Sequence, residues 1–467
     1  MSDEIVFARE FGKFVTEWDY ERFPTDVVQQ TKLSILDTIG VTVRGSVQAS
    51  TAIVRDISVE MGGKEESTLL GTGEKVPSLS AAFVNGTSAH SLELDDHISH
   101  KRSLGHPGVV SLPAALALGE AVQASGKDFI AAYIHGYEVT SRLNDVVPTG
   151  FDNFTRGFHG TAITGTFGAA ALSGKLLGSD VDQIASAIGI CGTMTSGSFE
   201  YNKSGAWTKR LHAGHSSRNG LMAALMAHRG YTGPHTAIEG RHGFLNSYFG
   251  PGNYDSDLIL KDLGEDWVSR HIMYKPFSCS GVLHSPITST KKVMTENGTD
   301  YRDIERIVVH TSSTIVTEMT NPRERRIAPQ TTVDAQFSLP YAVAVMAVRG
   351  KALLNEFNEE TIADPEVRKV AALVEFYVDP EIEKVWPTEE PSTVRVFLKD
   401  GRELSASVPG PKGGLEVPMS AQELEEKFVD LVSPVLGESR ASDVIQAVAS
   451  LEDFDDVRDL APLLYAS

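Results

Sequence analysis

Residues 160–177 decide the fold, and they read Gly-Thr-Ala-Ile-Thr-Gly-Thr-Phe-Gly-Ala-Ala-Ala-Leu-Ser-Gly-Lys-Leu-Leu. The stretch contains no proline, and Lys175 is its only charged residue. Its apolar residues cover nearly all sides of a helix, and its Gly and Ala residues allow close packing. Such a helix belongs in the middle of a large bundle. The sequence therefore predicts a buried central helix here.

Similar helical patterns lie on both sides of this stretch. Residues 27–43 place apolar side chains at helical spacing behind a Pro24-Thr25 start signal, and residues 209–229 end at Gly230, which suits a C-cap. The other helices expected in this part are residues 78–92, 113–124, 128–144 and 181–192. Residues 1 to about 265 are therefore predicted to be mostly helical.

The pattern changes after about residue 268. Strands are expected at residues 304–310, 393–398 and 404–408, and Asp400-Gly401 supplies a hairpin turn between the last two. A helix is expected over residues 335–348, and residues 420–462 return to a helical pattern.

These patterns predict a fold class that is mainly α with α+β. The chain would form a large all-helical domain from residues 1–267 and 406–467. Residues 268–405 would form a smaller α+β lid domain. A loop rich in Pro and Gly at residues 409–414 marks the return to the first domain.

The composition restricts the class of protein. A chain of 467 residues has room for two to four domains, and 41% apolar with 22% charged residues describes a globular protein. Lys and Arg number 42 against 62 Asp and Glu, so the net charge of −20 argues against a nucleic-acid partner. The two cysteines exclude a disulfide scaffold and fit a reducing compartment.

Targeting and membrane signals are missing from the sequence. The acidic start Met1-Ser2-Asp3-Glu4 is not followed by a long apolar run, and no stretch reaches 18 apolar residues without a charge. The final Tyr465-Ala466-Ser467 is not a peroxisomal address. We therefore expect a cytoplasmic protein with no membrane partner, and mitochondria and peroxisomes remain alternative locations.

A polar segment at the end of the Ala-rich helix 78–92 is the first candidate site. Within seventeen residues it holds three carboxylates and four histidines: His90, Glu93, Asp95, Asp96, His97, His100 and His106. Carboxylates can act as general bases, and histidines as acids or bases near pH 7. Simple helix capping would not need this density, so the segment predicts a functional role.

Two further clusters lie at predicted helix starts. His159 stands just before the central helix, where the helix dipole favours a neutral imidazole and anionic ligands. Lys209, Arg210 and His212 lie at one end of the last helix of this part, in a locally basic segment that suits a carboxylate or phosphate. The alternatives are a plain cap for the histidine and a solvated basic face for the second cluster.

Standard cofactor motifs are absent from the sequence, which has no Walker, dinucleotide-loop, nucleophile-elbow or His-Glu-x-x-His pattern. The pairs His97-x-x-His100 and His212-x-x-His215, with carboxylates nearby, could bind a metal. Because such spacings are weak evidence in loops, we expect no metal.

Several motifs resemble those of the MmgE/PrpD family, in the same order along nearly the whole chain. They are Leu-Asp-Thr-Ile-Gly at 36–40, His-Ser-Leu-Glu-Leu-Asp-Asp at 90–96, His-Pro-Gly at 106–108, Gly-Tyr-Glu-Val at 136–139, Gly-Phe-His at 157–159, Thr-Gly-Thr-Phe-Gly at 164–168, Lys-Arg-Leu-His-Ala-Gly at 209–214, Lys-Pro at 275–276 and Phe-Ser-Leu-Pro-Tyr at 337–341. The resemblance implies a helical domain built from both chain ends, an inserted α+β lid, a homodimer and no cofactor. It also implies proton transfer next to a carboxylate of a small di- or tricarboxylic acid.

The resemblance also implies roles for individual residues. The expected catalytic residues are His159, His106, Lys209, Asp95, Asp96 and Glu93. In this scheme His159 and His106 exchange protons, and an aspartate orients one of them. The expected substrate-binding residues are Lys275, Arg210, His212, Arg102, Tyr137 and His97.

The family's activities include 2-methylcitrate dehydration, cis-aconitate decarboxylation and iminodisuccinate epimerisation. Glu93 stands where the decarboxylases have Asp, and Ser280 stands where they have His. The dehydratases have a Trp-containing acidic segment at the place where this chain has Leu-Asp-Asp-His, residues 94–97. We expect a cofactor-independent lyase, either a dehydratase or a decarboxylase. An epimerase of a substituted succinate and a non-catalytic anion-binding protein on the same fold remain alternatives.

Overall fold

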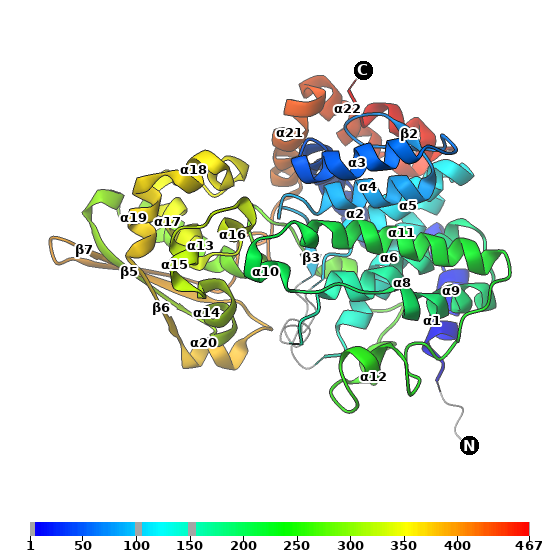
Figure 1. Cartoon of the computed structure of the whole chain (residues 1–467), viewed down its shortest axis with the longest axis horizontal. Helices are drawn as coiled ribbons and strands as arrows, with labels where there is room; N and C mark the ends of the chain where they lie inside the picture. The colour runs from blue at the N-terminus through cyan, green and yellow to red at the C-terminus, as the bar shows by residue number, and fades with distance from the viewer. Residues whose placement is uncertain (1–4, 99–104, 148–155, 467) are drawn as a thin grey trace.

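The computed structural model describes residues 5–98, 105–147 and 156–466, as a large helical body beside a smaller mixed one (Figure 1). The helices of the large body include α1 (Phe7–Glu17), α2 (Thr25–Gly45), α3 (Ala49–Met61), α4 (Ser78–Ala89), α5 (Gly108–Val122), α6 (Gly126–Asn144), α8 (Gly160–Leu176), α9 (Val181–Met194), α10 (Tyr201–Ser204), α11 (Thr208–His228) and α12 (Phe244–Tyr248). Every helix expected before residue 265 is present. Within the described ranges, no helix is long and apolar enough to cross a bilayer.

Helix α8 runs through the helical body and contacts α5, α6, α9 and α11. A Cβ atom on Gly168 of α8 would lie 2.0 Å from Thr140 Oγ1 of α6. A Cβ atom on Gly220 of α11 would lie 2.4 Å from the carbonyl oxygen of Thr166. Both distances are far below van der Waals contact, so these helices approach closely only because glycine stands there. The prediction of a buried central helix is confirmed.

The smaller body contains a four-stranded sheet in the order β6-β5-β7-β8. Its strands are β5 (Ile304–Thr311), β6 (Val374–Val378), β7 (Ser392–Leu398) and β8 (Glu403–Val408). Strands β5 and β6 are parallel, and the other two pairs are antiparallel. The sequence predicted three of these strands. It missed β6, whose five residues bury only Val374 and so lack a clear alternation.

Helices accompany this sheet. They are α13 (His284–Glu296), α14 (Ser313–Thr320), α15 (Arg323–Ile327), α16 (Thr332–Gln336), α17 (Leu339–Arg349), α18 (Glu359–Ala363), α19 (Pro365–Ala372) and α20 (Pro380–Val385). Helices α13 and α17 pack on each other and on the sheet. The predicted fold class, mainly α with α+β, is confirmed. The division of the chain into domains at residues 268 and 405 stays a prediction.

Two helices differ from those expected. Helix α5 begins five residues earlier than expected, so that Pro113 lies inside it. The helix tolerates this proline because a proline removes a single N–H donor and the remaining turns compensate for the loss. The helix expected over residues 335–348 is interrupted between α16 and α17. Ser338 accepts a hydrogen bond from the backbone N–H of Tyr341 and thereby caps the start of α17.

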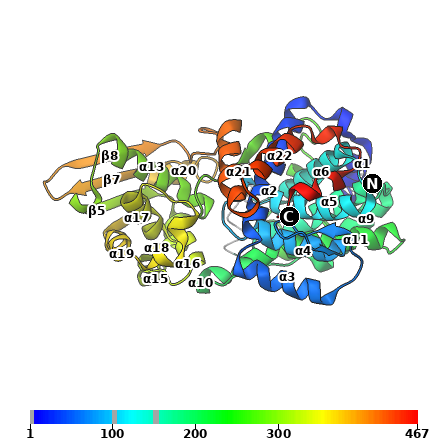
Figure 2. The same ribbon diagram turned by 90° about the horizontal axis from the view of Figure 1, so that it is seen from above.

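The last helices, α21 (Ala421–Leu436) and α22 (Glu438–Ala449), return to the helical body (Figure 2). Helix α21 packs on α2, where a Cβ atom on Gly40 would lie 3.0 Å from the ring of Phe428. Lys427 donates to Asp37 Oδ1 at 2.7 Å and to the carbonyl oxygen of Leu94 at 2.7 Å. The C-terminal helices therefore also hold the polar segment that follows α4.

Candidate active site

A cavity is formed jointly by the helical body and the smaller body. Six of the predicted site residues line it: Glu93, His97, His106, His159, Lys209 and Lys275. The rest of the wall is mostly apolar and includes Phe199, Tyr201, Val282, Met319 and Phe337. The cavity therefore combines a charged, imidazole-rich part with an apolar part.

The loop after α4 places Glu93 in the cavity wall. Its φ of +55° lies in the left-handed region, which costs a non-glycine residue about 1–2 kcal/mol. The neighbouring Leu92 is held in place, because its carbonyl oxygen accepts hydrogen bonds from Ser278 Oγ at 2.7 Å and from Gln336 Nε2 at 3.0 Å. Both donors come from the second half of the chain, so this loop joins the two bodies.

A short two-stranded sheet adds a second connection. Strand β3 (His97–Ile98) pairs with β4 (Ile272–Met273) in antiparallel register. The ring of His97 lies against Gly281, where a Cβ atom would be 2.8 Å from Nε2. This pairing brings His97 and Lys275, which follows β4, to the same side of the cavity.

Glu93 forms ion pairs with both lysines of the cavity. One carboxylate oxygen accepts from Lys209, and the other lies 3.4 Å from Lys275 Nζ. Burial alone would raise the pKa of Glu93, but the two ammonium groups outweigh it and lower that pKa to about 2. Burial lowers the pKa of Lys209, whereas at Lys275 Asp95 and Glu93 outweigh burial and raise the pKa. The wall thus presents two ammonium groups suited to substrate carboxylates.

Asp95 fixes the tautomers of two histidines. Its Oδ2 lies 3.0 Å from His90 Nδ1 and 2.8 Å from His106 Nδ1. The Nδ1 atom of His106 also lies 2.9 Å from the carbonyl oxygen of Asp96. Burial would raise the pKa of Asp95, but His90, Lys275 and His106 hold it well below the usual value. An ionised carboxylate only accepts, so both Nδ1 atoms carry hydrogen and Nε2 of each ring keeps its lone pair.

His106 is therefore a neutral imidazole with a basic nitrogen at the cavity. Burial lowers the pKa of His106 to about 4, even though Asp95 acts in the opposite direction. If the ring takes up a proton, the carboxylate behind it stabilises the resulting imidazolium. This pairing is the arrangement that a general base needs.

His159 precedes α8, and its backbone N–H donates to the carbonyl oxygen of Gly197 at 3.0 Å. Its Nδ1 lies 3.1 Å from Nδ1 of His212, which does not line the cavity as far as the chain is described. Burial, followed by repulsion from His212 and Lys209, lowers the pKa of His159 well below its usual value. Burial also lowers the pKa of His212 to about 3. His212 therefore acts on the site through the imidazole of His159, which lies in the cavity wall.

Other predicted residues lie behind the cavity wall. Asp96 accepts hydrogen bonds from Tyr137 at 2.6 Å and from Ser34 at 3.0 Å, and burial raises the pKa of Asp96 to about 7. Its side chain faces this hydroxyl network, while its backbone carbonyl oxygen supports His106. The structure thus places Asp96 and Tyr137 as supports of the histidine rather than in the cavity wall.

The remaining predicted residues are not brought into the wall either. Arg210 donates to Ser50 Oγ at 2.9 Å, on another side of α11 from the lysine that precedes it. Arg102 lies outside the described residues.

His90 and Tyr201 are among the residues at the site to which the sequence analysis gave no catalytic or substrate-binding role. His90 belongs to a quoted motif, but only the fold shows that it shares Asp95 with His106. Tyr201 has no motif signal, and its buried hydroxyl has no hydrogen-bond partner among the described residues.

Comparisons with known proteins agree with the order of the motifs. Models of the MmgE/PrpD N-terminal and C-terminal domains match residues 9–257 and 277–453. The cis-aconitate decarboxylase of Aspergillus terreus is 29% identical over 462 residues, covering 94% of this chain and 92% of the relative. A cis-aconitate decarboxylase-like protein of Aspergillus oryzae is 30% identical, with 97% and 96% covered. Human cis-aconitate decarboxylase is 28% identical, with 94% and 90% covered.

We expect Glu93→Gln to destabilise the protein by about 3–5 kcal/mol near pH 7, because it leaves Lys209 and Lys275 as buried charges without this partner. The loss should shrink at high pH, where the lysines release their protons. Chemical denaturation followed by circular dichroism at two pH values measures both effects. Glu425→Gln, at an exposed position of α21, is the matched control and should stay within about 0.5 kcal/mol of wild type. Equal stability of the two variants would contradict the assignment.

Proposed function

This chain belongs to the MmgE/PrpD family, and on that basis we propose that it is a lyase acting on a small di- or tricarboxylic acid. The first candidate reaction is decarboxylation of a cis-aconitate-like acid, since the relatives named above carry that activity in their names. Dehydration of a 2-methylcitrate-like acid is the second form of the same proposal. The observation that carries it is the pair of neutral imidazoles, His106 and His159, in one cavity with two ammonium groups.

Substrate binding begins with charge. Lys209 and Lys275 face the cavity and share the single carboxylate of Glu93, so a substrate carboxylate can take up the remaining ammonium hydrogens. In the buried site these contacts are stronger than in water. They also stabilise the negative charge that develops on a carboxylate when a neighbouring carbon loses a proton or carbon dioxide.

Proton transfer uses the imidazoles. In dehydration, one ring in its neutral form removes the proton from carbon, and the other ring, in its protonated form, gives its proton to the hydroxyl, which leaves as water. In decarboxylation, the electron pair of the broken carbon–carbon bond stays with the substrate, and a protonated ring delivers a proton to that carbon. The bound substrate is a polyanion and raises the pKa of nearby His106 and His159, so that one of the two rings can hold the proton that is transferred.

One geometric observation also favours an epimerase. His106 and His159 belong to different elements, and their ring centroids lie 6.1 Å apart with planes inclined by 41°. Two acid–base groups that approach one carbon from different sides can remove a proton from one face and return it to the other. No leaving group is then needed, and a substituted succinate would be the substrate.

The decisive measurement is NMR of an acid panel incubated with the protein in heavy water. The panel contains citrate, methylcitrate, cis-aconitate and substituted succinates. Loss of carbon dioxide or water identifies a lyase, and deuterium uptake without a new product identifies an epimerase. No exchange in any acid, together with binding, would support the non-catalytic alternative and refute the proposal.

We expect His106→Gln and His159→Gln to lower turnover by about 10²–10⁴-fold each, because each removes a proton-transfer group. Far-UV circular dichroism should show an unchanged fold, since glutamine fills a similar space. His242→Gln, at an exposed position away from the cavity, is the matched control and should keep full activity. Full turnover by a folded His159→Gln variant would refute the assignment.

The pH dependence of turnover should report the lowered pKa of His106. Because the pKa of His106 is lowered to about 4, its basic form persists well below pH 6.5. For dehydration or epimerisation, in which a neutral ring removes a proton from carbon, we therefore expect kcat/KM to stay level from pH 7 to about 5 and to fall as the pH drops through about 4. A stability control at each pH separates titration from unfolding. An acid limb near pH 6.5 that disappears in His106→Gln would contradict this prediction.

We also propose that the chain forms a homodimer, as the family resemblance implies. Helix α3 carries large apolar side chains on its outer surface, where Ile53 and Ile57 are each 54% exposed and Met61 is 74% exposed. An exposed apolar stripe of this kind is typical of an interface between subunits. Sedimentation equilibrium should give twice the chain mass, and Ile57→Asp should lower it toward the monomer. A monomeric wild-type chain would refute the proposal.

A further inference from the structure

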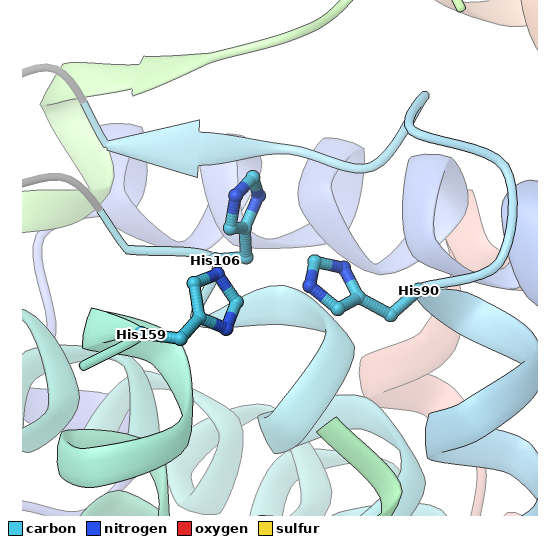
Figure 3. Close-up of side chains that lie close together, drawn as sticks. All are labelled: His90, His106 and His159. Carbon is cyan, nitrogen blue, oxygen red and sulfur yellow. The ribbon is translucent and has the colours of Figure 1, made fainter. Parts of the chain in front are cut away.

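Three histidine rings meet at the inner end of the cavity. His90 follows the end of α4, His106 precedes α5 and His159 precedes α8, and the three rings approach one another (Figure 3). One ring nitrogen from each residue can be chosen so that all three lie within 4.8 Å of one another. His106 and His159 line the cavity, and His90 is fully buried beside them.

The hydrogen bonds behind two of these rings resemble those found behind metal-binding histidines. Histidine ligands of metals usually donate their other ring N–H to a carboxylate or a carbonyl oxygen. Here Asp95 accepts from Nδ1 of both His90 and His106, which turns Nε2 of both rings into a lone-pair donor. Nδ1 of His159 lies 3.1 Å from Nδ1 of His212, and one of these two nitrogens donates to the other.

His90 has no task in the proton-transfer scheme. Its side chain is completely buried, and Nε2 has no hydrogen-bond partner among the described residues. A buried nitrogen lone pair without a partner costs free energy. The Nε2 atom of His90 therefore has a lone pair that a ligand in the space between the rings could use.

We propose that His90, His106 and His159 form a binding site for one zinc-class divalent ion at the inner end of the cavity. The fourth coordination position faces the cavity, where water or a substrate carboxylate can occupy it. Three imidazoles with one open position are a coordination set that zinc adopts in proteins.

The site needs a small adjustment to hold the ion. Zinc–nitrogen bonds of about 2.0–2.1 Å in tetrahedral geometry place the ligand nitrogens about 3.4 Å apart. The present spacing of up to 4.8 Å closes if each ring nitrogen moves by about 1 Å, which is within the range of a side-chain rotation. Nearby charges do not oppose the ion overall, because Glu93 and Asp95 balance Lys209 and Lys275.

Occupation of this site has a consequence that rests on the proposed function. The ion would bind the same ring nitrogens of His106 and His159 that exchange protons with substrate. A proton and a metal ion cannot share one lone pair, so the ion should inhibit turnover reversibly.

Isothermal titration of the purified chain with zinc chloride tests the binding itself. We expect one ion per chain in wild type, and Co²⁺ in its place should give the intense visible absorption of a tetrahedral site. His90→Gln should abolish stoichiometric binding, and Asp95→Asn should weaken it by about 10–100-fold because the carboxylate behind the ligands is lost. His242→Gln is the control and should bind like wild type.

Two results would overturn the ion site. One is the absence of stoichiometric zinc binding by wild type, and the other is equal zinc affinity of wild type and a folded His90→Gln variant. If His90→Gln does not fold, the Asp95→Asn comparison and the Co²⁺ spectrum of wild type decide instead.

A second measurement separates this proposal from the proposed function. Zinc should stop turnover or deuterium exchange in the acid panel, and a chelator should restore it. Binding of one ion with undiminished turnover would uphold the site but refute the proton-transfer roles of His106 and His159. Binding by a chain that is silent on every acid would uphold the site and refute the lyase.

Discussion

Glu93 joins two buried ammonium groups from distant parts of the chain, Lys209 at the start of α11 and Lys275 just after β4. Each charge alone would be costly to bury, and the three together satisfy one another. This pairing fixes the loop after α4, although Glu93 adopts an unfavourable backbone conformation there. Because Asp95 follows two residues later, the same constraint sets the position of the carboxylate that orients His90 and His106.

Burial sets the chemistry of the site as strongly as the residue types do. Histidines at the surface would carry a proton part of the time near pH 6.5, whereas the rings here are kept neutral by desolvation. The aspartate behind His106 is not enough to reverse this effect, but it determines which nitrogen is basic. The fold therefore supplies bases without supplying a ready acid.

The sequence predicted the parts of this molecule that depend on local pattern or on a resemblance. The central helix, the strands β5, β7 and β8, and the cavity residues His106, His159, Lys209 and Lys275 were all found in this way. It could not predict relations between distant segments. The placement of Asp96 and Tyr137 behind the wall, and the meeting of His90 with His159, depend on how helix ends converge, and no spacing along the chain encodes this.

Burial and the two lysines together keep these rings neutral until a substrate binds. Burial first, and then the ammonium groups of Lys275 and Lys209, disfavour a proton on His106 and lower its pKa. A bound di- or tricarboxylate cancels that repulsion and raises the basicity of His106 at the moment when a proton must be moved. Substrate charge therefore acts as a switch that makes proton transfer available when there is a carbon atom to receive or lose the proton.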